Sequence, residues 1–406
     1  TVPRSQLPKV LAEIQRIARS HGLQVANVFH AGDGNLHPNL LFDRRDRGQL
    51  ERVERASSDI MRVCVAHGGT ITGEHGVGLD KRAYMHLVHS PAELALQHRV
   101  RRVFDPDGRW NPGKVLPDLP DAPEPRHLPD PPDDAHRRAT ASLTSAAERG
   151  SGAEGCVHAP ADLTFTAATH LTLSEVQSAV AAGGQWWPVD PLVSGDPTLA
   201  HLVDWAPDHA FAASYGALRD LVLGMVVRLP DGSRVSLGGR VVKNVAGFDL
   251  CRLMIGSQGR LGYVEEVTLR LYGRPQNDVT LVASSDDLLG LAKLADRWAA
   301  AVPAAPALEL HARPGASSSL LARLLGSSTD VACMRSVLQP LAADLPVAVR
   351  ELGAEEAAWL RSQLRGPTVR PIDLPPAQRR GWFGRSFEAL AEVGSAQPAV
   401  LLADQG

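Results

Sequence analysis

Apolar residues recur at helical spacing in the first part of the chain. The spacing predicts a helix over residues 7–21, ended by Gly22, and a second helix over residues 50–64. Residues 25–29 and 39–43 are expected to form two paired strands, and residues 70–72 a short third strand. Ser90 and Glu93 form a capping box with Pro91 at the first helical position, which predicts another helix. This order favours an α+β unit in which helices pack on one face of an antiparallel sheet.

The pattern breaks from residue 117 onward, where seven prolines are mixed with acidic residues up to position 138. Such a segment has too little apolar surface to fold, so it predicts an extended linker. We therefore divide the chain into a first domain over 1–117, a linker over 118–150, a second domain over 151–275 and a poorly defined region over 276–406.

The second domain carries its own pattern of short elements. Strands are expected over 162–167, 221–229, 235–237 and 263–272, and Pro230, Asp231 and Gly232 turn the middle two into a hairpin. Ser174 is expected to begin a short helix and Asp249 to cap another over 250–255. From about residue 276 the chain is rich in Ala and Leu, which predicts helical stretches without a nameable motif.

The composition of the chain argues against several classes of function. The net charge of −3 over 406 residues, with no block of like charge, argues against nucleic acid as a partner. The apolar runs are too short to span a bilayer, and no signal peptide is visible at Thr1. The four cysteines are scattered, which favours a reducing, cytoplasmic setting, with membrane association only through partners, and excludes an iron–sulfur cluster in this chain.

Two histidines bracket a tight polar loop between the first two expected strands. If those strands pair, we expect His30 and His37 to lie opposite each other, with Cβ atoms roughly 5 Å apart, close enough to share one metal ion. Asp33, Gly34 and Asn35 supply the turn.

A Glu-His pair follows in a glycine-rich stretch about one supersecondary unit later. Glu74 is the natural third ligand, because two histidines and one carboxylate leave coordination positions open for a substrate. His75 is a candidate base. The alternatives are that the two histidines have only a structural role in a hairpin, and that Glu74 and His75 are ordinary residues of a glycine-rich loop. Asp33 fits a turn residue better than a fourth metal ligand. His67, His86 and His89 fit solvated or helix-terminal histidines.

Two more segments are open to functional and structural interpretations. Residues 104–114 end a helix and then turn, and they also suit an ordered loop that returns Asn111 to a cofactor. Gly256, Gly259 and Gly262 resemble a dinucleotide-binding motif, but their spacing differs from that motif and a strand is expected to follow them, which argues against a Rossmann fold.

Residues 30–37, 69–78 and 104–114 together resemble the C-terminal cap domain of FAD-linked 2-hydroxy-acid oxidoreductases, a group that includes the FAD-linked oxidase component of glycolate oxidase, D-lactate dehydrogenase and D-2-hydroxyglutarate dehydrogenase. The resemblance covers nearly all of residues 1–117. It implies divalent-metal ligands (Zn, Mn or Fe) at His30, His37 and Glu74, and a base at His75 that takes the hydroxyl proton. It also implies a substrate contact at Asn35 and a position near the flavin for Asn111.

Residues 219–224, 239–250 and 256–264 resemble a second component of glycolate oxidase, a flavoprotein of the same superfamily. In that family these segments line the FAD site, which implies cofactor contacts at Gly256, Ser257, Gly259, Gly262 and Val264. The implied fold class is α+β: an FAD-linked oxidase C-terminal cap, with an antiparallel sheet and helices, plus a partial PCMH-type FAD-binding domain. The resemblance also implies a poorly defined, cap-like region over 276–406.

Two departures from the family pattern bear on the flavin. A complete FAD-linked oxidase component would carry an FAD domain before its cap, and this sequence begins at the cap. In the second half, Ala200-His201 stands where the family has two glycines, and residues 204–209 replace a run of small residues. Bulky side chains there are expected to hinder a dinucleotide pyrophosphate.

The resemblance implies a component of an FAD-dependent enzyme that oxidises a small 2-hydroxy acid, such as glycolate or D-lactate, by metal-assisted proton removal with hydride transfer to the flavin. Its expected partners are an iron–sulfur electron-transfer subunit and a separate FAD-domain chain. The alternatives are a non-catalytic or scaffold subunit and a truncated product without independent activity.

Overall fold

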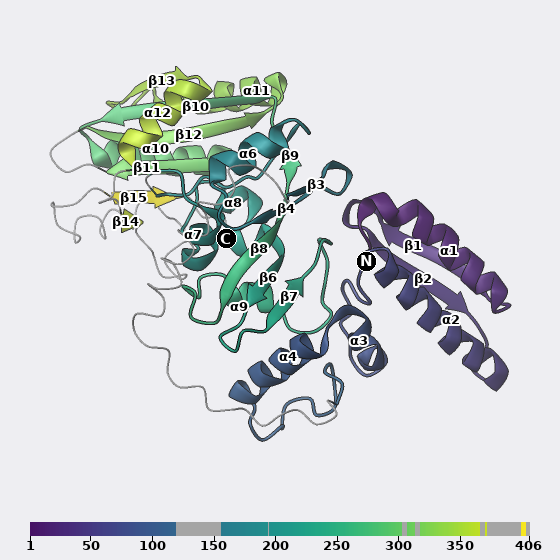
Figure 1. Cartoon of the computed structure of the whole chain (residues 1–406). Helices are drawn as coiled ribbons and strands as arrows, with labels where there is room; N and C mark the ends of the chain where they lie inside the picture. Colours follow the sequence, from purple (N-terminus) through teal and green to yellow (C-terminus); the bar gives the residue numbers. More distant parts are fainter. Residues whose placement is uncertain are drawn as a thin grey trace. The chain divides into compact units, whose positions relative to one another are not determined.

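A computed structural model describes residues 1–118, 156–193, 195–302, 307–312, 317–365, 370–371 and 399–402 (Figure 1). These residues belong to two compact units. Unit 1 is Thr1–Leu171, Val203–Trp205 and Val222–Leu271; unit 2 is Thr172–Leu202, Ala206–Leu221 and Tyr272–Gly406. Both mix helices and strands, which confirms the α+β class. The predicted linker lies, apart from its first residue, outside the described residues, and the predicted domain boundaries stay a prediction.

The N-terminal part of unit 1 is a strand pair covered by two helices (Figure 1). Its elements are α1 (Leu7–Ser20), β1 (Gln24–His30), β2 (Asn35–Leu41) and α2 (Arg47–Ala66). The apolar faces of both helices enter one core, built mainly of Val10, Ile14, Ile17, Ala56, Ile60 and Cys64. The helices predicted over 7–21 and 50–64 are therefore confirmed. The second strand starts four residues earlier than predicted, at Asn35 rather than position 39.

Residues 70–72 do not form the predicted strand. Their backbone groups instead bond to two distant segments: the N–H of Thr70 donates to the Thr1 carbonyl, and the Thr72 carbonyl accepts from the N–H of Val245. The backbone is thus satisfied without a ladder, which the local sequence does not reveal.

Two helices, α3 (Met85–Val88) and α4 (Pro91–Phe104), complete the first 118 residues. The capping box of Ser90 and Glu93 is confirmed. Glu93 is buried, and its second carboxylate oxygen accepts from the N–H of Ser236. Gln97 Oε1 accepts from the N–H of Phe248. Helix α4 is therefore bonded to the segment around residues 236–248.

A five-stranded antiparallel sheet forms the rest of unit 1, in the order β3-β4-β8-β6-β7. The strands are β3 (Val157–Ala159), β4 (Thr164–Ala168), β6 (Val222–Arg228), β7 (Arg234–Gly238) and β8 (Tyr263–Arg270). The predicted hairpin is confirmed as β6 and β7, and Asp249 caps α9 (Leu250–Met254). A strand follows the glycine-rich turn at 256–262, as expected for a fold other than the Rossmann fold.

Unit 2 contains a six-stranded sheet in the order β13-β10-β12-β11-β15-β14. Its strands are β10 (Asn277–Ser285), β11 (Ala307–Ala312), β12 (Ser318–Gly326), β13 (Ala348–Leu352), β14 (Arg370–Pro371) and β15 (Ala399–Leu402). The unit also holds a small strand pair, β5 (Gln185–Trp186) and β9 (Tyr272–Gly273), and α6 (Leu173–Ala181) and α8 (Ala212–Tyr215). Helix α7 (Leu199–Trp205) begins in this unit.

The central strands of this sheet are buried on both faces. Leu281, Leu320 and Leu324 pack with α10 (Leu288–Ala301) and α11 (Ser328–Leu338). The alternate residues Val282 and Leu321 pack with α12 (Ala354–Leu364). Burial on both faces gives a continuous apolar run instead of an alternating one. The helical stretches predicted after residue 276 are present as α10, α11 and α12, and the strands between them were not predicted.

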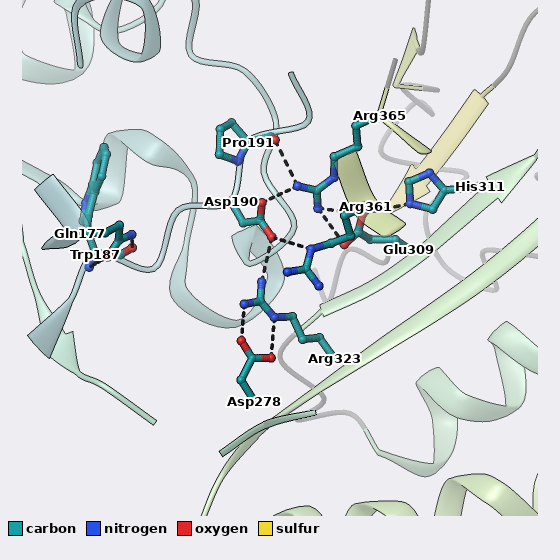
Figure 2. Close-up of polar contacts among 10 residues, drawn as sticks. All are labelled: Gln177, Trp187, Asp190, Pro191, Asp278, Glu309, His311, Arg323, Arg361 and Arg365. Carbon is teal, nitrogen blue, oxygen red and sulfur yellow. Dashed lines mark hydrogen bonds and ion pairs between the residues drawn. The ribbon is translucent and has the colours of Figure 1, made fainter. Parts of the chain in front are cut away.

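Unit 2 also encloses a network of buried ion pairs (Figure 2). Asp190 lies among three arginines, 2.8 Å from Arg323 Nη1 and 3.5 Å from Arg361 Nε, and it pairs with Arg365. Arg365 also donates to both oxygens of Glu309, at 2.9 Å each. Burial raises the pKa of Glu309, but the charge of Arg365 outweighs it and holds this pKa well below its usual range. Asp190 thus compensates charge from three side chains at once.

We expect Asp190→Asn to destabilise unit 2 by about 3–5 kcal/mol, because removing one partner leaves buried guanidinium groups uncompensated. Urea denaturation measures the change. Asp344→Asn is the matched control, because Asp344 pairs with Arg297 at the surface of the same unit and exposed pairs contribute little. Equal effects of the two substitutions would contradict the central role of Asp190.

Candidate functional site

The pairing of β1 and β2 brings His30 and His37 together, but in a different register from the one predicted. His30 pairs with Asn35, and His37 pairs with Val28, so the histidines are diagonal neighbours rather than direct partners. Diagonal residues lie on the same face of a strand pair, within reach of long side chains. The two ring centroids are 5.3 Å apart. The predicted register was wrong, but the predicted proximity is confirmed.

Glu74 completes the group. Its Oε2 lies 3.6 Å from His37 Nε2, and its Oε1 lies 4.0 Å from His30 Nε2. One ligand atom from each of the three residues falls within 4.8 Å of the others. The sequence therefore identified three side chains that converge in the folded chain.

The turn between the strands is tight because of Gly34. Ala31–Asp33 forms one 3₁₀ turn, and Gly34 follows with φ of 68°, a left-handed conformation that favours glycine. The Gly34 carbonyl accepts from the N–H of Val2, and a Cβ on Gly34 would lie 1.9 Å from the Val2 carbonyl oxygen. No other residue type fits this position without moving the chain.

Asn35 is 2% exposed and is bonded at both ends of its amide. Its Nδ2 donates to His37 Nε2 at 3.1 Å, and its Oδ1 accepts from Thr1 Oγ1 at 2.9 Å. These bonds fix the orientation of the His37 ring. The predicted substrate contact at Asn35 stays a prediction, and the observed bonds favour a role in positioning His37.

A lysine from the second half of the chain lies directly on this group. Lys243 Nζ is 2.5 Å from Glu74 Oε1 and 3.0 Å from Asp33 Oδ2. The bond to Lys243 lowers the pKa of Glu74, and the bonds to Glu74 and Asp33 raise the pKa of Lys243. Glu74 and Lys243 thus stabilise each other's charged forms, and Asp33 is an ion-pair partner of Lys243 as well as a turn residue.

The segment that carries Lys243 is fixed to residues 70–97 by several bonds. Asn244 Oδ1 accepts from Thr70 Oγ1 at 3.0 Å, and the Ala246 carbonyl accepts from His89 Nε2 at 2.6 Å. Ala246 is buried in an apolar cluster with Ile71, Val77, Met85, Leu94 and Leu116. The position of Lys243 is therefore defined by the packing on both sides of it.

The three convergent residues suit a divalent metal ion. Donor atoms about 2.1 Å from a tetrahedral ion lie roughly 3.4 Å apart, so small side-chain rotations would bring His30, His37 and Glu74 to that spacing. Two imidazoles and one carboxylate are ligands for Zn, Mn or Fe, and they leave positions open for a substrate. The His37 nitrogen that accepts from Asn35 would exchange this hydrogen bond for the metal.

His75 lies beside the group. Its ring centroid is 5.6 Å from that of His37, and the side chain is exposed. It is separate from the three convergent residues, so its predicted role as a base stays a prediction. Among the other histidines, His86 is exposed and bonded to the Ala83 carbonyl, as expected of a helix-terminal residue.

The predicted cofactor turn at 256–262 is bonded largely to the chain itself. The N–H groups of Gly256 and Gln258 donate to the carbonyls of Val203 and Asp204, and the N–H of Ser257 donates to the Met254 carbonyl. Gly262 and Val264 are buried, and Gly259 has a left-handed conformation with φ of 70°. Ser257 Oγ is buried without a hydrogen-bond partner among the described residues, so it remains available to a ligand.

Asn111 lies apart from this turn, in the loop after α4, and its φ of 44° is left-handed. It lines an open cavity of about 350 Å³ together with Phe104, Trp110, Lys114 and Phe248. Its predicted role at a cofactor stays a prediction, and the cavity provides mainly apolar surface for a ligand.

Sequence reasoning missed Lys243. It lies within residues 239–250, which were assigned to a flavin site, and its partner Glu74 is 169 positions away. The segment also carries Arg240, Asn244 and Asp249, so no local signal singles out Lys243. A pair of this separation becomes visible through packing alone.

We expect Gly73→Ala to lower the free energy of unfolding of unit 1 by about 1–3 kcal/mol, as overpacking of a filled site does. An added Cβ would lie 2.0 Å from Thr1 Oγ1 and 2.5 Å from Asn35 Oδ1. Thermal unfolding measures the loss. Gly32→Ala is the matched control in the same site, because nothing lies within 4 Å of its added Cβ. An unchanged midpoint for Gly73→Ala would contradict the packing described.

Comparison with known proteins agrees with the N-terminal geometry. Residues 1–115 match the family described as FAD linked oxidases, C-terminal domain. Over 119 residues the chain is 47% identical to glycolate oxidase subunit GlcD of Escherichia coli (strain K12), which covers 29% of this chain and 24% of that protein. It is 39% identical over 116 residues to GlcD of Bacillus subtilis (strain 168), covering 29% of this chain and 25% of that protein.

A third relative extends the range of named activities. The probable mitochondrial D-lactate dehydrogenase of Danio rerio is 35% identical over 115 residues, which cover 28% of this chain and 23% of that protein. The chain thus spans about a quarter of the length of these curated relatives. Among the described residues, no helix combines the length and apolar character needed to cross a bilayer. Residues 1–115 are accordingly similar to the C-terminal domain of FAD-linked oxidases.

Proposed function

We propose that this chain is a component of an FAD-dependent oxidoreductase that converts a small 2-hydroxy acid, such as glycolate or D-lactate, into its 2-oxo acid. The observation that carries the proposal is the convergence of His30, His37 and Glu74, with His75 beside them. The similarity of residues 1–115 to glycolate oxidase subunit GlcD and to D-lactate dehydrogenase supports it.

Each residue of the site has a distinct task in this proposal. His30, His37 and Glu74 would hold a divalent ion, which would supply Lewis-acid chemistry to a 2-hydroxy acid bound at the open coordination positions. His75 accepts the hydroxyl proton, because it lies next to the ligands without being one of them. Before an ion binds, Asn35 keeps the His37 ring oriented through its bond to Nε2, and this nitrogen would then turn to the metal.

FAD, when bound, would accept the hydride released from the substrate carbon. The turn at 256–264 has few free hydrogen-bond donors for the flavin in the described conformation, because several of its N–H groups already donate to backbone carbonyls. Ser257 Oγ and the cavity lined by Asn111 are the groups that remain available. We therefore derive no catalytic step through the flavin, and the supply of FAD by this chain or by another chain stays open to test.

The partners follow from the chemistry. Two electrons must leave a reduced flavin, and the scattered cysteines of this chain offer no cluster spacing, so an iron–sulfur subunit is the proposed acceptor. The resemblance of the second half to another flavoprotein component of glycolate oxidase belongs to the same proposal. Both expectations concern an assembly rather than the isolated chain.

The second candidate is a non-catalytic subunit that retains the fold. Lys243 already satisfies Glu74, and the turn at 256–258 is already satisfied by Val203 and Asp204. A scaffold that binds neither metal nor flavin would have its polar groups bonded within the chain in this way. Metal binding separates the two candidates.

We expect His37→Ala to abolish binding of Zn²⁺ or Mn²⁺ by the full chain, because it removes one of three ligands. Metal content after dialysis, measured by mass spectrometry, gives the result. His86→Ala serves as the matched control, because His86 is bonded only to a helix carbonyl among the described contacts. Full metal occupancy in His37→Ala would refute the ligand assignment, and an empty wild-type chain would favour the scaffold.

We expect His75→Ala to keep the metal and to lose turnover by about 10²–10⁴-fold, the usual contribution of a general base. Dye-linked oxidation of glycolate and D-lactate, with FAD and the partner subunits added, measures turnover. Metal analysis of the same preparation provides the internal control. Unchanged turnover in a metal-loaded variant would rule out the role of His75 as base.

A further inference from the structure

The convergent site contains more charge than metal binding requires. Glu74 and Asp33 are both bonded to one ammonium group, that of Lys243, at 2.5 and 3.0 Å. The lysine side chain is 32% exposed, so this pairing is neither fully buried nor fully screened. A metal site of two histidines and one carboxylate would form without Lys243 or Asp33, and their presence calls for a reason.

Counting charge suggests that reason. With neutral histidines, the two carboxylates and one ammonium carry a single negative charge. A divalent ion would bring this group to a single positive charge. A monoanionic carboxylate then neutralises it, whereas without the ammonium the loaded group would be neutral before any anion arrived. Charge complementarity of this kind governs which ligands a site accepts.

The position of Lys243 is preorganised for this task. Asn244 accepts from Thr70, and the N–H of Val245 donates to the Thr72 carbonyl, immediately before Gly73 and Glu74. The buried Ala246 fixes the other side of the segment. The ammonium therefore stays at the edge of the site when its carboxylate partner is engaged elsewhere, and it can then bind an anionic oxygen.

We propose that Lys243 is the specificity-determining residue of this site: its ammonium competes with the metal for Glu74 and, once the metal is bound, selects a monoanionic carboxylate over a neutral ligand of the same shape. This inference rests on the proposed function, because it assumes that the three convergent residues hold a divalent ion. It adds a residue from the second half of the chain to a site otherwise built from the first 75 residues.

Lys243→Met is expected to move two binding constants in opposite directions. Mn²⁺ binds more tightly, because the competing ammonium on Glu74 is gone, and glycolate binds the Mn²⁺-loaded chain at least about tenfold more weakly, the scale of one lost charge contact at partial exposure. Titration calorimetry with the full chain at fixed pH measures both. Glycolamide, the neutral amide of glycolate, is the ligand control and is expected to lose no affinity.

Two further variants separate charge from packing. Lys243→Arg keeps the positive charge and is expected to keep the preference for glycolate over glycolamide. Lys9→Met, on the exposed face of α1 in the same unit, controls for a general change in net charge and is expected to leave both constants unchanged.

The outcomes are distinguishable. Equal weakening of glycolate in the Met and Arg variants would assign Lys243 a packing role and overturn the inference. A wild-type chain that binds Mn²⁺, with both constants unchanged in Lys243→Met, would overturn the inference and leave the metal site standing. A wild-type chain that binds no Mn²⁺ would overturn both the inference and the proposed function.

Discussion

The site depends on one constraint: a carboxylate, Glu74, must be held between two imidazoles and an ammonium that reach it from separate segments. The imidazoles come from the two strands of one hairpin, and the ammonium comes from the segment after β7. Without the ammonium, the carboxylates of Glu74 and Asp33 would repel each other. Here Glu74 and Asp33 each lie within ion-pair distance of Lys243, so both carboxylates have a partner of opposite sign.

Much of the packing in unit 1 serves to meet that constraint. Gly34 permits the tight turn that brings His30 near His37, and Asn35 fixes the His37 ring. Residues 70–72 form no strand, and their backbone instead hydrogen-bonds to Thr1 and to Val245. The buried Glu93 and Gln97 of α4 accept from the backbone of residues 236 and 248. A short hairpin and a distant loop thereby share one local framework.

Sequence reasoning identified the three convergent side chains but not their geometry. Residue type and spacing were sufficient for His30, His37 and Glu74, although the expected register was wrong because the connection is a four-residue turn. Lys243 was assigned elsewhere, since a contact across 169 positions depends on tertiary packing. The sheet of unit 2 was missed for another reason: strands buried on both faces, such as β12, lack the alternation that marks a strand.

The proposed function depends on coordination of one divalent ion by His30, His37 and Glu74. X-ray absorption at the zinc edge of the Zn²⁺-loaded full chain tests it most directly, because it reports ligand types without requiring activity. We expect a first shell of nitrogen and oxygen at about 2.0–2.1 Å with the outer-shell signature of two imidazoles. A shell containing sulfur, or one without imidazole, would contradict it.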